Sequence, residues 1–296
     1  MKIYIDGSLY DKDDAKVSVF DHGLLYGDGV FEGIRAYNGR VFRLEEHVER
    51  FFDSARGILL DFPLSREEAA AAIVDTVRAS GLKDAYIRAV LTRGAGDLGL
   101  DMRKCKRPTF IIIVDKIALY PEAVYRKGLD LVTSSLRRPA ADVLNPAIKS
   151  LNYLTSILAR AEATRAGAHE AVLLNQQGHV AECTGDNIFM VHGGRLRTPP
   201  LWSGILGGIT RAVVLDIARG KLGLEAVEDV CTTFDLYRAD EVFVTGTGAE
   251  VIGAVRIDGR VIGNGLPGPV TQRIVSAFRE YANSNGTPVY ETVGAR

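Results

Sequence analysis

The sequence is poor in cysteine and carries almost no net charge. Its three cysteines, Cys105, Cys183 and Cys231, lie far apart and form no C-x-x-C pair. Neither a disulfide framework nor a thiolate zinc site is therefore expected, and a reducing cytoplasm fits the chain best. The formal net charge of -1 provides no field that would gather nucleic acid or an anionic membrane. We expect no nucleic-acid partner.

Long apolar runs and metal-ligand spacings are also missing. No apolar stretch reaches the length of about 20 residues that a membrane-spanning helix needs. Residues 1–6 read as a strand and lack the apolar core of a signal peptide. The five histidines fall at no metal-ligand spacing, and no G-x-S-x-G elbow, P-loop or Rossmann fingerprint occurs. We expect a soluble protein that is not exported, with no membrane partner and no metal.

A chain of 296 residues, with 47% hydrophobic and 25% charged residues, suits one large or two medium globular domains. Period-two alternation and apolar runs predict strands over 2–6, 15–20, 85–93, 109–117, 129–135, 170–175, 179–183, 187–191 and 241–245. Capping signals and helical periodicity predict helices over 44–56, from Ser65 to Gly81, and over 151–166, 210–222 and 269–282.

This layering predicts an α+β fold rather than regular βαβ alternation. A proline, a glycine and charges interrupt two apolar runs between Tyr120 and Gly128, which marks a domain connection. We predict a smaller N-terminal domain over 1–120, a linker over 121–128 and a larger C-terminal domain over 129–296.

Lys149 is the most informative residue, because it is the only lysine between Lys127 and Lys221 and lies in a mostly uncharged run. Burial among aliphatic side chains disfavours an ammonium ion and can leave an amine that attacks a carbonyl. Taken alone, the segment favours an ordinary lysine that extends to solvent from the start of a helix.

Other features suit pyridoxal phosphate together with this lysine. Tyr153 lies one helical turn after Lys149, where a phenol could bond the ring hydroxyl. Glu182 closes a strand, and pyridoxal chemistry needs a carboxylate against the pyridine nitrogen. Two glycine-rich turns, over 206–211 and 245–248, resemble anion seats, and Arg50 could reach a phosphate. Each feature alone also has an ordinary structural explanation.

Several blocks in order carry a resemblance to the fold type IV pyridoxal-phosphate aminotransferases, D-amino acid aminotransferase-like in fold, and within them to the branched-chain amino acid aminotransferases. The blocks are 22–35, 46–50, 86–88, 148–153, 182–187, 208–211 and 244–250. The resemblance implies Lys149 as Schiff base and proton shuttle, with Glu182 on the pyridine nitrogen and Tyr153 on the ring oxygen. It also implies a phosphate cup of Arg50, Ile209, Thr210 and Thr247. The cofactor would occupy an interdomain cleft, in a homodimer or a multiple of dimers.

The expected reaction is ping-pong transamination of leucine, isoleucine or valine with 2-oxoglutarate. Period-two alternation places Tyr86 and Arg88 on one face of their strand. The resemblance adds Tyr26, Phe31, Gly248 and Ala249 to the substrate pocket. It also implies that Arg88 binds the distal carboxylate of glutamate. The alternatives are a D-amino acid aminotransferase, an aminodeoxychorismate lyase and a catalytically silent cofactor-binding scaffold. The loop after Gly94 lacks the Arg-x-His of D-specific enzymes.

Overall fold

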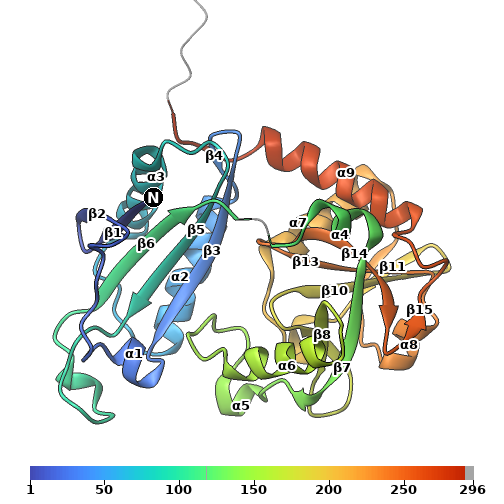
Figure 1. Ribbon diagram of the computed structural model, residues 1–296, viewed down its shortest axis with the longest axis horizontal. Coiled ribbons are helices and arrows are strands. Elements are labelled where there is room, and N and C mark those ends of the chain that lie inside the picture. Colours follow the sequence, from blue (N-terminus) through green and yellow to red (C-terminus); the bar gives the residue numbers. More distant parts are fainter. Residues whose placement is uncertain (118, 291–296) are drawn as a thin grey trace, which may run out of the picture. The chain divides into compact units, whose positions relative to one another are not determined.

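The computed structural model describes residues 1–117 and 119–290, which divide into two compact units. Unit 1 comprises Met1–Ile117, the short segment Ile148–Asn152 and residues 282–290. Unit 2 comprises residues 119–147 and Tyr153–Tyr281. Figure 1 shows a sheet with helices in each unit. The α+β layering is therefore present in both.

Unit 1 is built on a seven-stranded antiparallel sheet with the order β16-β4-β3-β5-β6-β1-β2. The strands are β1 (Lys2–Ile5), β2 (Ser8–Asp11), β3 (Gly29–Tyr37), β4 (Arg40–Val41), β5 (Ala85–Thr92), β6 (Thr109–Asp115) and β16 (Thr287–Pro288). The helices are α1 (His22–Tyr26), α2 (Leu44–Gly57) and α3 (Arg66–Ser80), with a 3₁₀ turn at Met102–Lys104.

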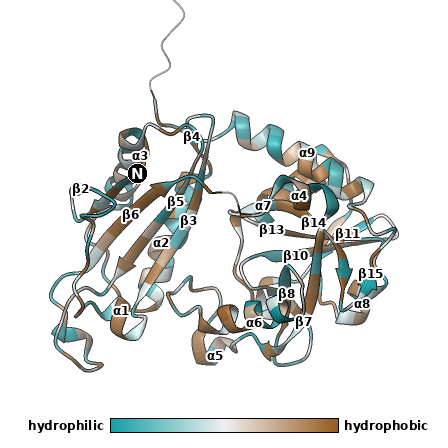
Figure 2. Ribbon diagram, viewed as in Figure 1, coloured by the Kyte–Doolittle hydropathy of each residue, from teal (hydrophilic) through white to brown (hydrophobic). Residues whose placement is uncertain are grey.

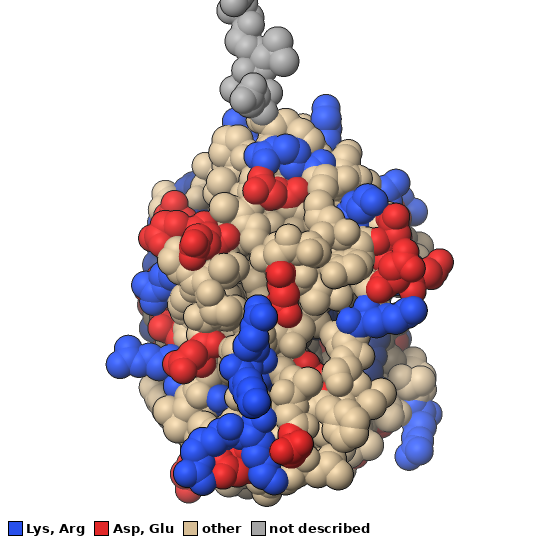
Figure 3. All heavy atoms as spheres, turned by 90° about the vertical axis from the view of Figure 1, so that its left-hand side faces the viewer, with Lys and Arg blue, Asp and Glu red and all other residues tan. Residues whose placement is uncertain are grey.

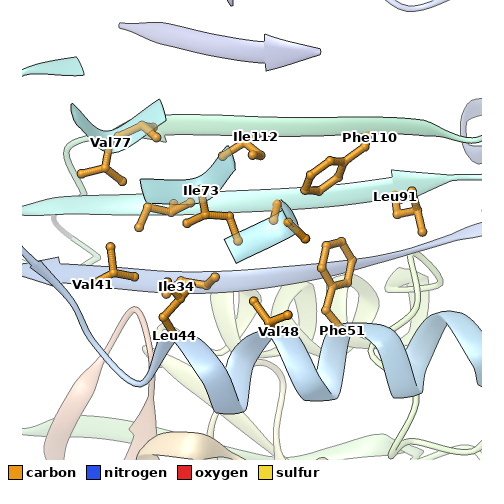
Figure 4. Packing of buried hydrophobic residues seen from close by; sticks show 14 of the residues in the cluster. Ile34, Val41, Leu44, Val48, Phe51, Ile73, Val77, Leu91, Phe110 and Ile112 are labelled. Carbon is orange, nitrogen blue, oxygen red and sulfur yellow. The ribbon is translucent and has the colours of Figure 1, made fainter. Parts of the chain in front are cut away.

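One face of this sheet packs on α2 and α3 and forms the core of unit 1. In α2, Leu44, Val48 and Phe51 recur at helical spacing, and all three are buried. Figure 4 shows them beneath strand residues such as Ile34 and Phe110. In Figure 2, β5 and β6 are largely brown, as expected for strands that line a core. The packing fixes α2, which carries Arg50, against β3, which carries Phe31.

Unit 2 is built on a nine-stranded mixed sheet with the path β12-β11-β10-β13-β14-β7-β8-β9, and β15 pairs with β14. The strands are β7 (Leu129–Arg137), β8 (Glu170–Leu174), β9 (Val180–Cys183), β10 (Asn187–His192), β11 (Arg195–Thr198), β12 (Ala226–Glu228), β13 (Glu241–Gly246), β14 (Glu250–Ile257) and β15 (Arg260–Val261). The helices are α4 (Glu122–Lys127), α5 (Ala141–Leu144), α6 (Leu154–Arg165), α7 (Ile209–Asp216), α8 (Thr233–Tyr237) and α9 (Pro269–Ser284).

Several predicted bounds differ from the structure. Residues 15–20 form no strand; the strand is Ser8–Asp11, which pairs with β1 as a hairpin. The predicted linker over 121–128 is largely helix α4, and residues 148–152 and 282–290 belong to unit 1 rather than to a C-terminal domain. The helix predicted over 210–222 changes at Ile217 into a π-helical turn. Only the membership of residues 148–152 and 282–290 in unit 1 depends on contacts between distant segments, which local patterns do not encode.

The surface is mixed in charge. On the face shown in Figure 3, groups of Lys and Arg side chains and groups of Asp and Glu side chains both occur, in line with the net charge of -1. Among the described residues, no helix combines the length and the apolar character needed to cross a membrane. The same residues contain no cluster of three side chains suited to hold a metal ion.

Candidate active site

Lys149 lies in an extended segment that is hydrogen-bonded to β3 and to α2. The Phe31 N–H donates to the Lys149 carbonyl at 2.9 Å, and the Lys149 N–H donates to Ser54 Oγ at 3.1 Å. Its Nζ lies 4.6 Å from the centre of the Phe31 ring. The backbone beneath this amine is therefore fixed, while the side chain is only half-buried.

The predicted helical relation between Lys149 and Tyr153 is wrong. The sequence predicts the helix from residue 151, but α6 begins at Leu154 and Tyr153 is its N-cap residue. Lys149 belongs to unit 1 and Tyr153 to unit 2. Ser150 bridges to Val30 of β3 instead of continuing a helix, and this long-range pairing gives the segment its extended conformation.

Arg50 forms an ion pair with Glu32, a buried acid on β3. Its Nε and Nη2 donate to the two carboxylate oxygens of Glu32 at 2.7 and 2.8 Å. His47 Nδ1 lies 2.7 Å from Glu32 Oε2. His47 and Arg50 are three positions apart on α2 and so share a face. Glu32 faces that helix because it lies two positions from both Val30 and Ile34 along β3 and therefore shares the face of these core residues.

The electrostatics of this group follow from its burial. Desolvation opposes ionisation of Glu32, but the Arg50 charge and the His47 hydrogen bond outweigh it, and the pKa of Glu32 falls to about 2. Burial also lowers the pKa of His47, although Glu32 acts in the opposite direction. At neutral pH the group therefore contains one carboxylate, one guanidinium and a neutral imidazole.

Phe31, Tyr86 and Arg88 lie together on the opposite face of the sheet, as predicted for the β5 pair. Arg88 Nη2 donates to Tyr86 Oη at 2.8 Å, and the guanidinium carbon lies 4.5 Å from the centre of the Phe31 ring. Arg88 Nε is buried and has no hydrogen-bond partner among the described residues. Gly33, directly across from Arg88, leaves room for the Tyr86 hydroxyl, since a Cβ there would lie 2.4 Å from it. Three of the predicted substrate residues thus form one cluster.

Tyr26 lies at the end of α1 and is partly exposed. Its hydroxyl accepts a hydrogen bond from the Gly99 N–H at 2.9 Å. His22 Nε2 lies 3.0 Å from the Asp97 carbonyl. These contacts join α1 to the loop after β5 and determine where the Tyr26 ring projects.

In unit 2, Glu182 is buried at the end of β9 and held on both carboxylate oxygens. Arg138 Nη2 lies 2.6 Å from its Oε1. Asn187 Nδ2 and the Leu206 N–H donate to its Oε2 at 3.2 and 3.1 Å. Three donors from separate segments therefore fix the plane of this carboxylate. Arg138 and Asn187 received no predicted role, although Asn187 lies within a motif block.

The two glycine-rich turns both lie near Glu182 in unit 2. Asn187, the first residue of β10, contacts Glu182 and lies next to both turns. Asn187 pairs with Thr245 of β13, and its Oδ1 would lie 2.0 Å from a Cβ at Gly208. A Cβ at Gly246 would similarly lie 1.9 Å from Asp186 Oδ1. Glycine is therefore required at both places, and the start of α7 and the β13–β14 turn lie on either side of the same loop.

Gly208 is the N-cap of α7 and offers no side chain to the first turn, in which Ile209 and Thr210 lie. Backbone N–H groups at such a helix start attract an anion. Thr247 and Gly248 lie in the turn between β13 and β14. Ala249 follows Gly248 in this turn and is fully buried in the core of unit 2.

The family model for class IV amino-transferases matches residues 29–257. The chain belongs to this family. A Methanocaldococcus jannaschii protein named "Putative branched-chain-amino-acid aminotransferase" is 52% identical over 98% of this chain and 100% of its own length. The Escherichia coli (strain K12) branched-chain-amino-acid aminotransferase is 39% identical, over 93% of this chain and 91% of its own.

Solved structures agree with this class IV assignment. The Thermoproteus uzoniensis branched-chain aminotransferase with norvaline matches with a TM-score of 0.91 and 42% identity, over 98% of this chain and 99% of its own. The T.th. branched-chain amino acid aminotransferase complexed with N-(5'-phosphopyridoxyl)-L-glutamate matches with a TM-score of 0.91 and 40% identity, over 96% and 94%. The predicted family and fold class are confirmed.

Proposed function

We propose that this class IV aminotransferase is a pyridoxal-phosphate-dependent enzyme that exchanges amino groups between branched-chain L-amino acids and 2-oxoglutarate. The similarity to branched-chain aminotransferases over almost the whole chain carries the proposal. The T.th. enzyme, which is 40% identical, has been solved with pyridoxamine 5'-phosphate and with 4-methylvaleric acid. The first of these ligands is a form of the cofactor, and the second is a carboxylic acid with a branched aliphatic chain.

The residues present fit the cofactor. Bound pyridoxal phosphate supplies an aldehyde that condenses with amines and a pyridine ring that withdraws electrons from the substrate. Lys149 provides the amine that moves a proton, on a backbone fixed by β3 and α2. Glu182 provides a fixed carboxylate for the pyridine nitrogen. Gly208 leaves the first turn of α7 open for a phosphate, which Arg50, Ile209, Thr210 and Thr247 would hold. Tyr153 is proposed to bond the ring oxygen.

The Phe31, Tyr86 and Arg88 cluster suits a pocket that accepts two kinds of side chain. The two rings provide apolar surface for leucine, isoleucine or valine. Arg88 provides a guanidinium whose buried Nε has no partner among the described residues, and the distal carboxylate of glutamate would satisfy such a donor. We propose that Tyr26, Gly248 and the backbone of Ala249 complete the substrate contacts.

We also propose that the enzyme is a homodimer or a multiple of dimers in the cytoplasm. Phe20, Leu24, Leu98 and Leu100 are exposed around α1 and the loop after β5, two segments that are joined by hydrogen bonds. A cluster of exposed large apolar residues is typical of a protein interface. Sedimentation analysis of the parent and of Leu24→Lys would test whether this surface mediates dimerisation.

A panel of amino donors with 2-oxoglutarate tests the proposed activity. Both enantiomers of leucine, isoleucine, valine and alanine are supplied to the purified protein loaded with pyridoxal phosphate. We expect turnover of the branched-chain L-amino acids and little turnover of D-alanine. Turnover restricted to D-amino acids would contradict the proposal, and so would release of pyruvate from aminodeoxychorismate without any transamination.

A further inference from the structure

Glu32 and His47 have no role in the chemistry described so far, although both are buried and both belong to one network with Arg50. Building on the proposed function, we propose that Glu32 is a positioning residue that aims Arg50 at the cofactor phosphate, with His47 holding Glu32 in place. Cofactor affinity would then depend on the geometry of the Glu32 carboxylate rather than on the net charge around Arg50.

The first argument is the directionality of the contact. Arg50 Nε and Nη2 form one edge of the planar guanidinium, and both donate to Glu32, at 2.7 and 2.8 Å. Two parallel hydrogen bonds define the plane as well as the position of an arginine side chain. The opposite edge of the guanidinium, which carries Nη1, must then point away from Glu32. A flexible side chain is thereby ordered before any anion binds.

The second argument is the support behind Glu32. Its side chain is fully buried on β3, and Arg50 is 15% exposed. His47, also buried, lies 2.7 Å from Glu32 Oε2. Glu32 thus has a contact to Arg50 on each oxygen and a further contact to His47. The network connects β3 to α2, which are both fixed by the core of unit 1.

The third argument concerns charge. A carboxylate beside a phosphate-binding arginine cancels part of its positive charge and repels the phosphate. By Coulombic attraction alone, therefore, Glu32 opposes phosphate binding. Glu32 favours phosphate binding only if the orientation it imposes on the Arg50 guanidinium contributes more free energy than the Coulombic attraction that its negative charge removes. The orientation and charge explanations therefore predict opposite signs when the charge of Glu32 is removed.

The test uses this opposition of signs. Apoenzyme of the parent, Glu32→Gln and Glu32→Asp is titrated with pyridoxal phosphate and, separately, with pyridoxal, which has no phosphate. Glutamine keeps the size but loses the charge and one acceptor. Aspartate keeps the charge but withdraws the carboxylate by about 1.5 Å, one carbon–carbon bond. Absorption spectra give the two dissociation constants for each protein.

Glu46→Gln is the matched control. Glu46 lies on the same helix α2, one turn before Arg50, pairs with Arg43 and is partly exposed, so this change removes the same charge near Arg50 but leaves the Glu32 carboxylate in place. We expect Glu32→Gln to bind pyridoxal phosphate at least tenfold more weakly, the scale of a lost charge-assisted hydrogen bond. We expect Glu32→Asp to bind it at least about threefold more weakly, on the same physical basis. Affinity for pyridoxal should change less than about twofold in both, and Glu46→Gln should resemble the parent.

Tighter binding of pyridoxal phosphate by Glu32→Gln would overturn the proposal in favour of simple charge. Equal losses for pyridoxal and pyridoxal phosphate would show a structural role only and would also overturn it. If Glu32→Gln is unfolded by circular dichroism, Glu32→Asp decides alone: a selective loss for the phosphorylated ligand supports the proposal, and parent-like affinity refutes it. Failure of the parent itself to bind pyridoxal phosphate would instead contradict the proposed function.

Discussion

Replacing Arg88 by leucine should separate the two amino donors that one pocket must accept. In the structure, Arg88 donates to Tyr86 Oη at 2.8 Å and lies over the Phe31 ring. Losing these two contacts affects the pocket for every substrate, at about 0.5 to 1 kcal/mol each. Only glutamate also loses a charge-assisted hydrogen bond, which is worth about 1.5 to 3 kcal/mol. Leucine has no distal carboxylate to lose.

The glutamate half-reaction should therefore slow by about 10- to 150-fold more than the leucine half-reaction, which is the stated free energy converted at about 1.4 kcal/mol per factor of ten. Single-turnover spectra that follow the bound cofactor with each amino acid alone measure both rates. Arg66→Leu is the control, because Arg66 is an exposed arginine whose guanidinium also lies over a phenylalanine ring, that of Phe52. Equal losses for glutamate and leucine would refute the assigned role of Arg88.

Four further outcomes follow from the structure. Lys149→Ala should lose transamination yet still bind pyridoxal phosphate non-covalently, as titration and activity assays would show; full activity would end the proposed chemistry. Glu182→Gln should keep the cofactor but transaminate at least on the order of a hundredfold more slowly in steady-state assays, and a rate within a few-fold of the parent would assign another acid to the ring. Phe51→Ala, at a fully buried position, should cost about 3 to 5 kcal/mol of unfolding free energy in urea; a loss below about 1 kcal/mol would contradict its place in the core. Acid should destabilise the protein. The unfolded chain protonates Glu32 near its ordinary pKa of 4.5, whereas the folded chain keeps it ionised to about 2. The resulting contribution, on the order of 3 kcal/mol, is present above pH 4.5 and is lost as the pH falls through the folded value of about 2. The lowered pKa of His47 likewise removes stability as the pH falls below 6.5. Thermal midpoints across about pH 3 to 7 should fall less in Glu32→Gln than in the parent.

Local signals predicted the longer helices α2, α3 and α9, but not the short helices α1, α4, α5 and α8. Ser65 and Glu68 form the reciprocal capping box that their spacing indicates, and α3 ends at Gly81, whose φ of 71° suits glycine. The Tyr86 and Arg88 pair was also predictable, because alternation along a strand depends only on backbone geometry. In these cases the residues that define the structure lie within a few positions of one another.

Non-local pairing explains what the sequence did not predict. The segment around Lys149 is extended because Phe31 and Gly29 of β3 pair with it, and no neighbour in the sequence indicates that partner. Glu32 reads as a single acid in an apolar strand until α2 is placed beside it. Arg138, a half-buried arginine that directly follows β7, contacts Glu182 of β9 from a distant part of the sequence. Each contact requires the assembled sheet.

Three buried glutamates in this chain each form an ion pair with an arginine and accept further hydrogen bonds or contacts. Glu32 pairs with Arg50, Glu182 with Arg138 and Glu170 with Arg160. A buried ion pair is weak support for stability by itself, and its presence does not identify a functional acid.

The positions of the other donors separate the three. Glu170 accepts from the adjacent Ala171 N–H and from the Thr184 N–H and hydroxyl, so it fixes the turn that follows Glu182. Glu182 is instead held beside the start of α7, and Glu32 holds the arginine proposed to bind phosphate. If this distinction is correct, removing the Glu170 charge should lower stability and leave the spectrum of bound cofactor unchanged. Changes at Glu32 and Glu182 should alter cofactor affinity and cofactor electronics, respectively. A spectral change at Glu170→Gln equal to that at Glu182→Gln would show that the turn, rather than the carboxylate it carries, controls the ring.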